Sequence, residues 1–282
     1  VSVLKTGLIW PFFYCYGCPL AAGGCPIGVL QHFMTLPAIP FYLIGTLGIY
    51  GTIFGRAFCG WACPFGGFQD ILGFFNKKKR KLKPLAYSKF VMLLLVIVSA
   101  WITLDTFFCK FCPAGSLFAA IPALFSFPSL NISLFFYVHI TTLILTVVLV
   151  LLFSRFWCRY LCPYGALLGI ISFLSPNKIK RNADKCIDCS LCTKACPSLI
   201  NVEKAKVVIS DECTSCLSCV DACPVEDTLY VKSYVTKRKV GKRSIGLAIV
   251  AVYFIILSIG MATGNWSSPT TKEEYLMHFK NK

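Results

Sequence analysis

Acidic residues are scarce in this chain of 282 residues, which has 12 Asp and Glu against 28 Lys and Arg. Eight of the acids lie between positions 184 and 235 together with five lysines, which leaves that segment with a net charge of −3. The other acids are Asp70, Asp105, Glu273 and Glu274. No nucleophile, catalytic base or substrate pocket is evident. We therefore predict no catalytic residue and expect any catalysis to belong to a partner subunit.

Charge is also sparse along several apolar runs. The chain is 56% hydrophobic with a mean hydropathy of +0.70, which favours a membrane protein. A transmembrane helix needs about 20 apolar residues. The runs at 87–108, 132–157 and 245–264 have this length, 41–58 is shorter, and 1–14 resembles the end of another span. These runs predict a mainly α, polytopic transmembrane helical protein.

Basic residues concentrate in three short runs, at 77–83, 178–181 and 237–243. Such a run can bind nucleic acid. Beside hydrophobic segments it is more typical of a cytoplasmic loop, because positive residues stay on the cytoplasmic side of membrane proteins. We therefore predict no nucleic-acid binding, membrane lipid as the surroundings, and a multi-pass protein of the cytoplasmic membrane.

Eight of the seventeen cysteines form two copies of one pattern. The spacing C-x2-C-x2-C-x3-C-P, which starts at Cys186 and again at Cys213, is that of bacterial ferredoxins with two [4Fe–4S] clusters. Three thiolates of each run bind one cluster, and the fourth binds the other. The predicted ligands are Cys186, Cys189, Cys192 and Cys223 for cluster one, and Cys213, Cys216, Cys219 and Cys196 for cluster two. Zinc is the alternative, but a zinc site has no use for the third cysteine.

The remaining sequence contains an internal repeat. The pattern C-x2-C-P at Cys15 and Cys18 recurs at Cys109 and Cys112, and R-x2-C-x3-C-P-[FY]-G recurs at 56–66 and 155–165. Because proline is favoured in the first turn of a helix, short half-helices should begin directly after the cysteines. The predicted domains are a first membrane repeat (1–83), a second membrane repeat (84–178), a small α+β ferredoxin-like domain with two [4Fe–4S] clusters (179–236), a C-terminal transmembrane helix (245–264) and a tail (265–282).

The repeat supplies eight further candidate ligands. We call Cys59, Cys63, Cys158 and Cys162 the inner-side set, because basic loops follow them, and Cys15, Cys18, Cys109 and Cys112 the outer-side set. Four thiolates suit one [4Fe–4S] cluster, so the sequence predicts four clusters. The alternative, four ligands from one repeat, would join opposite ends of a layer about 30 Å thick. Cys25, which has no repeat partner, could replace Cys15 or Cys18.

Three other residues are candidates for cofactor binding. Arg56 and Arg155 stand three residues before the inner-side cysteines and could offset the negative charge of a cluster. Their alternative role is snorkelling towards the membrane interface. His139 lies in a predicted span, where an ionisable group is a functional candidate, and a quinone site would need such a proton-exchanging group.

The motif at 56–66, its copy at 155–165 and the following two-cluster run resemble the NapH/NosR-type polyferredoxin membrane proteins. This resemblance covers most of residues 40–235. It implies a respiratory electron-transfer subunit; some members are proposed to oxidise quinol and others to serve oxidase assembly through metal reduction. The chain departs from the family pattern in its C-x2-C-P copies and in having no large flavin-binding domain.

We therefore expect an integral-membrane iron–sulfur subunit that carries electrons between a cytoplasmic redox partner and the membrane or its far side. The expected partners are a cytoplasmic redox subunit or soluble electron carrier and an extracytoplasmic redox protein, within a hetero-oligomeric oxidoreductase complex. The ferredoxin-like domain should face the cytoplasm. The alternatives are a quinol dehydrogenase subunit, and a metal-reductase or assembly factor for a respiratory oxidase.

Overall fold

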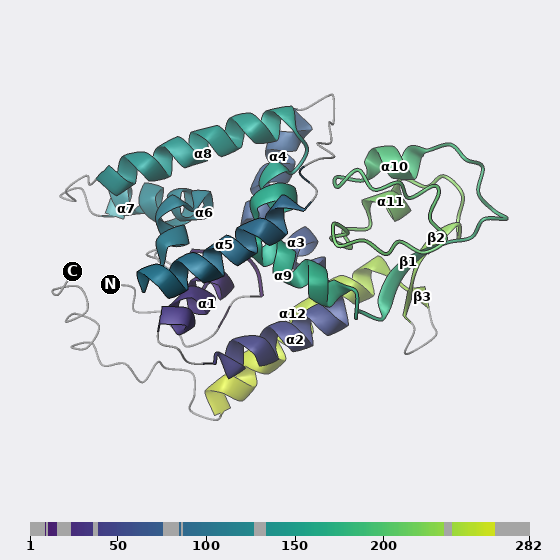
Figure 1. Ribbon diagram of the computed structural model, residues 1–282. Coiled ribbons are helices and arrows are strands. Elements are labelled where there is room, and N and C mark those ends of the chain that lie inside the picture. Colours follow the sequence, from purple (N-terminus) through teal and green to yellow (C-terminus); the bar gives the residue numbers. More distant parts are fainter. Residues whose placement is uncertain are drawn as a thin grey trace.

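The computed structural model describes residues 9, 11–15, 24–35, 39–75, 85, 87–126, 134–233 and 239–262. Its elements form a large helical part and a smaller module, which lies on the right in Figure 1 and contains the sheet. The predicted basic run at 77–83, the tail at 265–282 and Cys18 lie outside the described residues.

The helical part contains most of the helices. Its elements in chain order are α1 (Pro26–Thr35), α2 (Phe41–Phe54), α3 (Ala57–Trp61), α4 (Pro64–Phe74), α5 (Ser88–Thr103), the 3₁₀ helix η2 (Phe107–Phe111), α6 (Pro113–Gly115), the π-helix η3 (Ser116–Ala120), α7 (Ile121–Ser126), α8 (Leu134–Leu152), the π-helix η4 (Trp157–Leu161) and α9 (Pro163–Ser172). The last helix, α12 (Lys242–Ala262), runs beside α2 (Figure 1), where Tyr50 and Phe54 share a buried cluster with Ile249.

Four helices begin at a proline that directly follows a cysteine, as predicted from the sequence. They are α1, α4, α6 and α9. Proline fits there because its fixed φ matches the helix and its missing N–H would have no helical partner. The preceding cysteine has extended backbone in three of them, with ψ of 112° at Cys63, 118° at Cys112 and 109° at Cys162. Each of these thiols therefore sits at the start of a helix.

The prediction of a polytopic transmembrane protein, with spans that include 245–264, is wrong. Within the described ranges, no helix combines the length and the apolar composition that crossing a membrane requires. In two of the apolar runs the helix ends within the run. Helix α2 ends before Gly55, which has φ 60°, and α5 ends before Leu104, which has φ 49°. At 1.5 Å per residue, α2 and α5 extend only about 21 and 24 Å, against about 30 Å for the hydrocarbon layer.

The module at the other end is a small α+β unit, with an antiparallel sheet of order β1-β2-β3. The strands are β1 (Asn177–Arg181), β2 (Leu229–Ser233) and β3 (Lys239–Val240), and the short helices are α10 (Leu191–Ala195) and α11 (Ser218–Asp221). Ile179 pairs with Val231 in the register, and both side chains are buried with Leu229. One face of the sheet therefore covers the core of the module.

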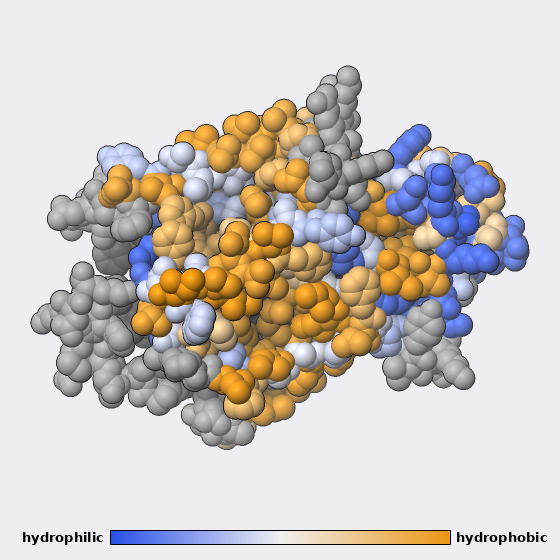
Figure 2. All heavy atoms as spheres, viewed as in Figure 1, coloured by the Kyte–Doolittle hydropathy of each residue, from blue (hydrophilic) through white to orange (hydrophobic). Residues whose placement is uncertain are grey.

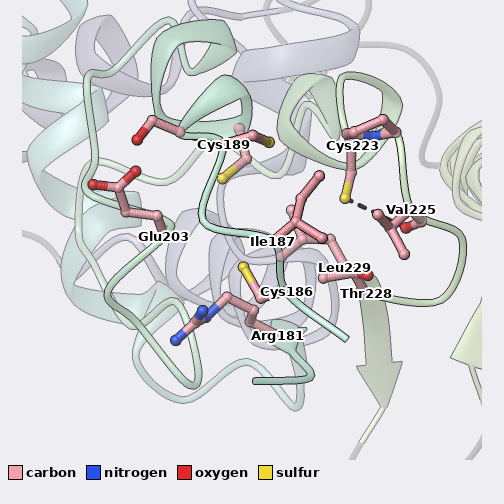
Figure 3. A pocket seen from close by; sticks show the side chains of 12 residues that line it. Arg181, Cys186, Ile187, Cys189, Glu203, Cys223, Val225, Thr228 and Leu229 are labelled. Atoms are coloured by element: carbon pink, nitrogen blue, oxygen red, sulfur yellow. Dashed lines mark hydrogen bonds between the residues drawn. The ribbon is translucent and has the colours of Figure 1, made fainter. Parts of the chain in front are cut away.

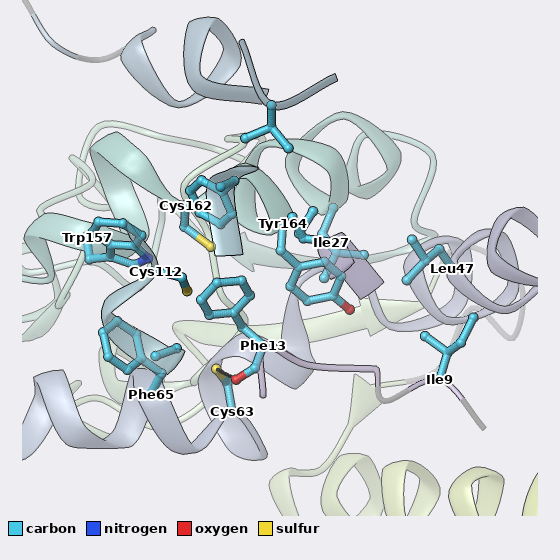
Figure 4. Close-up of a cluster of buried hydrophobic side chains, with 14 of the residues drawn as sticks. Ile9, Phe13, Ile27, Leu47, Cys63, Phe65, Cys112, Trp157, Cys162 and Tyr164 are labelled. Atoms are coloured by element: carbon cyan, nitrogen blue, oxygen red, sulfur yellow. Dashed lines mark hydrogen bonds between the residues drawn. The ribbon is translucent and has the colours of Figure 1, made fainter. Parts of the chain in front are cut away.

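The surfaces of the two parts differ. Figure 2 shows hydrophobic residues over much of the helical part and hydrophilic residues over the module. Inside the helical part, the main core joins α1, α2, α4, α5, α6 and α9, and it contains Cys63, Cys112 and Cys162 beside Phe13 and Phe65 (Figure 4). Cysteines from distant parts of the sequence are thus components of one apolar core.

Candidate iron–sulfur sites

The first pocket of the module is lined by the four cysteines that the spacing assigns to cluster one. These are Cys186, Cys189 and Cys192 from the first run and Cys223 from the end of the second (Figure 3). Asp188 and Ser190 adopt positive φ angles of 50° and 59°, which coil the chain between the cysteines. Cys189 is exposed, so this pocket lies near solvent.

The second pocket is lined by the four cysteines assigned to cluster two. They are Cys213, Cys216 and Cys219, with Cys196 from the first run. Ser215 and Leu217 repeat the positive φ angles of the first run, at 48° and 64°. The two runs therefore share one backbone conformation and exchange their fourth cysteine.

The inner-side set is assembled from both sequence repeats. Gly66 N–H donates to Cys63 Sγ at 3.4 Å, and Gly165 N–H donates to Cys162 Sγ at 3.3 Å. Gln69 Nε2 donates to Cys158 Sγ at 2.9 Å. Such N–H donors and helix starts stabilise a thiolate.

The thiols of this set also interact with one another. Burial raises the pKa of Cys63, and the neighbouring Cys158 and Cys59 raise it further. Burial raises the pKa of Cys158 to about 11, although the adjacent Arg155 opposes the rise. The structure thus brings Cys59, Cys63, Cys158 and Cys162 together in an apolar site, where burial also raises the pKa of Cys162.

The outer-side set is also brought together, as far as it is described. Burial raises the pKa of Cys112, and Cys109, Cys15 and Cys25 raise it further. The pKa of Cys109 is raised to about 12 by burial, then by Cys25 and Cys15. Gln31 Nε2 donates to Cys109 Sγ at 3.4 Å. Cys25 therefore lies near Cys109 and Cys112 of the predicted set, whereas Cys18 lies outside the described residues.

The two sets lie close to each other. Tyr164 is buried, and its pKa is raised by that burial and by cysteines of the inner-side set as well as by Cys25. Cys63 Sγ lies 3.8 Å from the carbonyl oxygen of Phe13, and Tyr14 follows as a backbone hydrogen-bond partner of Cys25. The segment that leads to Cys15 therefore passes from one set to the other.

The inner-side set also touches the second pocket of the module. A Cβ on Gly60 would lie 2.6 Å from the Thr214 carbonyl oxygen, so only glycine permits this approach. Beside it, Trp61 Nε1 donates to the Ser215 carbonyl at 3.0 Å. The last turn of α3, directly after Cys59, is thus packed on the loop between Cys213 and Cys216.

Arg56 and Arg155 lie at this junction. Arg155 is buried, pairs with Asp70, and donates from Nη1 to Thr214 Oγ1 at 3.0 Å. Arg56 donates to the Asp211 carbonyl oxygen. The charge of Arg155 acts on both Cys158 and Cys196, one from each site. Both guanidinium groups are therefore near candidate ligands, which is compatible with the predicted offset of cluster charge.

Further buried ion pairs join the helical part to the module. Lys89 of α5 pairs with Asp211, and Arg159 of η4 pairs with Glu212 at 3.2 Å. Burial lowers the pKa of Lys89, while the hydrogen bond with Asp211 opposes the change. A buried pair is strongly destabilising to break, because one charge is then left without a partner. These contacts hold the module in one orientation.

His139 of α8 packs where α6 ends and η3 begins. Ser116 Oγ lies 3.2 Å from His139 Nδ1 and donates to the His139 carbonyl oxygen at 2.6 Å. Burial lowers the pKa of His139, and a backbone hydrogen bond at Cys112 opposes it. His139 therefore contacts the segment that carries Cys112, and its predicted role in quinone binding stays a prediction.

The donor sets fit iron–sulfur clusters. The sixteen described cysteines are all free thiols. Within the described ranges, no three His, Cys, Asp or Glu side chains are placed to hold a single metal ion. In a [4Fe–4S] cluster each of the four cysteines binds a different iron, so the thiolates surround a larger group. The two sets of cysteines in the module, which each line one pocket, have the chemistry and the arrangement for such groups.

We did not predict four further residues of these sites from the sequence. Gln31, Gln69, Gly60 and Asp70 each contact a candidate ligand, its loop or its neighbouring arginine. A signal for the two glutamines was present, because both stand six residues after a Cys-Pro cysteine. Gly60 and Asp70 have no such signal, since their roles depend on partners from the other part of the structure.

Comparison with known proteins agrees with this chemistry. Residues 35–83, 85–127 and 135–182 match the family described as 4Fe-4S binding domain, and residues 178–224 match the 4Fe-4S dicluster domain. No solved structure matches the chain.

Three curated relatives have names that concern electron transfer. YccM of Escherichia coli strain K12, described as a candidate electron transport protein, is 34% identical over 268 residues, which cover 88% of this chain and 72% of YccM. The ferredoxin-type protein NapH of Haemophilus influenzae is 26% identical over 52% of this chain and 50% of its own length. The methylamine utilization ferredoxin-type protein MauN of Paracoccus denitrificans is 41% identical over 15% of this chain and 16% of its own length.

The repeated Cys-Pro sites, the dicluster module and these similarities agree on one class of protein. The chain is an iron–sulfur electron-transfer protein, and it belongs to the NapH-type polyferredoxin family.

Proposed function

We propose that this chain is a relay with four [4Fe–4S] sites, two in the module and two in the helical part. When bound, each cluster accepts or donates one electron at a time. The observation that supports the proposal is the contact of Gly60, which directly follows Cys59, with Thr214 in the lining of the second pocket. The first pocket, with its exposed Cys189, then stands at one end of the series.

The module is the part that we expect to meet a redox partner. Its segment from 184 to 235 has a net charge of −3 in a chain of net charge +16. An acidic surface favours a partner with a basic docking face, and salt should weaken their association because exposed charges are screened over about 10 Å at 0.1 M. The predicted place at the cytoplasmic membrane and the predicted partner at the far end stay predictions.

The relatives support electron transfer but name no single reaction for this chain. The similarity that covers 88% of the chain is to a candidate electron transport protein, and the NapH similarity covers about half of the chain. The quinol dehydrogenase and the metal-reductase alternatives each need a further partner or pocket, and no described contact favours one of them over the other.

An iron count tests the number of sites. Protein purified without oxygen should contain about 16 iron atoms per chain, four for each cluster. Cys158→Ala should remove about four of these and one EPR signal of the reduced protein. A wild-type preparation with about eight iron atoms, all retained in Cys158→Ala, would contradict the proposed sites of the helical part.

Rapid mixing tests the order of the sites. A one-electron protein donor gives up one electron for each site reduced, and wild type should accept about four. Cys189→Ala should slow reduction of the remaining sites by this donor but not by dithionite, which is small enough to reach sites without docking. Equal rates with the protein donor in wild type and Cys189→Ala would show that electrons enter elsewhere.

A further inference from the structure

Cys63, which belongs to the inner-side set, and Cys25, which belongs to neither predicted set, begin the same sequence pattern. The residues from 25 to 31 read Cys-Pro-Ile-Gly-Val-Leu-Gln, and those from 63 to 69 read Cys-Pro-Phe-Gly-Gly-Phe-Gln. The common pattern is C-P-x-G-x-x-Q. Cys18 is also followed by proline, but alanine stands where this pattern has glycine, and no glutamine follows at the sixth position.

The two copies of this pattern have the same local structure. Cys25 directly precedes α1 and Cys63 directly precedes α4, so each thiol stands at the start of a helix. The amide of Gln31 donates to the Ile27 carbonyl, four residues back, at 3.3 Å. The amide of Gln69 donates to the Phe65 carbonyl, also four residues back, at 3.3 Å.

Each glutamine also reaches a cysteine of the other sequence repeat. Gln31 Nε2 lies 3.4 Å from Cys109 Sγ, and Gln69 Nε2 lies 2.9 Å from Cys158 Sγ. Both glutamines have side chains that are 0% exposed. A buried amide keeps its position only where its partners are fixed, because a buried polar group without a hydrogen bond is costly. The two arrangements therefore correspond: Cys25, Gln31 and Cys109 are placed like Cys63, Gln69 and Cys158.

The correspondence extends to the second cysteine of each pair. Cys112 and Cys162 both precede a helix-starting proline, and both have extended backbone, with ψ of 118° and 109°. Cys25 also accepts from the backbone at Gly28 and Ile27, as a helix-start thiol would. Its further contact with Tyr14 places it beside the residue that precedes Cys15.

We propose that the outer-side site takes Cys25 instead of Cys18, so that Cys15, Cys25, Cys109 and Cys112 are the four ligands of one [4Fe–4S] cluster. The site is then built like the inner-side site, with one Cys-Pro thiol and one glutamine from the first sequence repeat and a cysteine pair from the second. The proposal deepens the proposed function, since it assumes that this site holds a cluster, and it selects one of the alternatives that the sequence left open, Cys25 in place of Cys18.

Alanine variants of the two cysteines distinguish these assignments. Cys25→Ala should lose about four iron atoms and the same EPR signal as Cys109→Ala. Cys18→Ala should keep the wild-type iron content and all signals. Loss of iron in Cys18→Ala, with or without loss in Cys25→Ala, overturns the proposal, and so does retention of all signals in Cys25→Ala.

A measurement on wild type covers the case in which a variant fails to fold. Alkylation of the iron-loaded protein, read by mass spectrometry, should modify Cys18 and spare Cys25 until a chelator has extracted the iron. Modification of Cys25 before extraction overturns the assignment. About 16 iron atoms in wild type with an unaffected Cys25→Ala variant refutes only this ligand, whereas about eight in wild type refutes the four-site function as well.

Discussion

The module and the helical part assemble their candidate sites in different ways, from residues close together in sequence and from residues far apart. In the module, three ligands of each set come from seven consecutive residues, and positive φ angles at Asp188 and Ser190, repeated at Ser215 and Leu217, coil each run. In the helical part, the contacts that build a site join residues far apart in sequence: Gln31 and Cys109 are separated by 78 residues, and Gln69 and Cys158 by 89. Sites of the first kind depend on local backbone, and sites of the second kind depend on packing of the core.

The first prediction concerns a substitution in the core of the helical part, which should affect the sites of that part and leave those of the module intact. Phe65 is 1% exposed and packs against Phe13 and Trp157, at ring-centroid distances of 6.2 and 6.3 Å. Phe65→Ala should destabilise the helical part by about 3–5 kcal/mol, because it removes a buried ring and leaves a cavity. The iron content should fall towards about eight atoms per chain. The two EPR signals of the module should be retained.

The matched control is Phe74→Ala on the same helix, where the ring is 87% exposed. This change should alter stability by less than about 0.5 kcal/mol and leave the iron content unchanged. Urea unfolding, iron analysis and EPR of the reduced protein provide the readouts. Loss of the module signals in Phe65→Ala, with those of the helical part retained, would contradict the comparison.

The second prediction concerns a substitution at the contact between the two parts, which should slow electron transfer without removing iron from either part. A Cβ at Gly60 would lie 2.6 Å from the Thr214 carbonyl and 3.3 Å from Cys216 Cβ. Gly60→Ala should therefore move α3 away from the loop that carries Thr214 and cost about 1–3 kcal/mol through overpacking. Electron transfer from the module to the inner-side set should slow, while the iron content stays at the wild-type value. Stopped-flow reduction by a protein donor measures the rate.

Gly67→Ala is the control for this change, because a Cβ there meets no heavy atom within 4 Å. It lies within α4, where alanine in place of glycine should stabilise by about 0.4–1 kcal/mol. Transfer rates that are equal in wild type and Gly60→Ala would show that electrons do not pass through this contact.

The smallest expected effect distinguishes the two sites of the helical part from each other. An N–H donor to a ligand sulfur stabilises the more negative, reduced state, so its loss should lower the reduction potential. Gln69→Leu should shift only the inner-side signal and Gln31→Leu only the outer-side signal, each by about 1 kcal/mol, or about 40 mV for one electron. The shift should be larger for Gln69, whose amide lies 2.9 Å from sulfur against 3.4 Å for Gln31.

Redox titration followed by EPR measures both potentials in one protein. Each variant serves as the control for the other, since the remaining three signals should keep their midpoints. An upward shift, or a shift of all four signals together, would mean that the amides act through folding and not through their hydrogen bonds to sulfur.

The module shows how far spacing alone can predict a site. The cysteine spacing placed Cys186, Cys189, Cys192 and Cys223 in one group, and the structure places these four around one pocket. The starts of α1, α4, α6 and α9 were also predictable, because proline after cysteine is a local signal. Membrane spans were not, because hydrophobic run length does not reveal that the helix ends at Gly55 or at Leu104.

The sequence by itself determined the chemistry of this protein: repeated Cys-Pro units and a dicluster run are local patterns that need no tertiary contact to be recognised. Only the tertiary structure decided which distant segments meet. It placed Cys25 beside Cys109 and Cys112, and it packed Gly60 onto Thr214. The physical reason is that these contacts follow from the joint packing of helices around one apolar core, and such packing depends on all of its side chains at once.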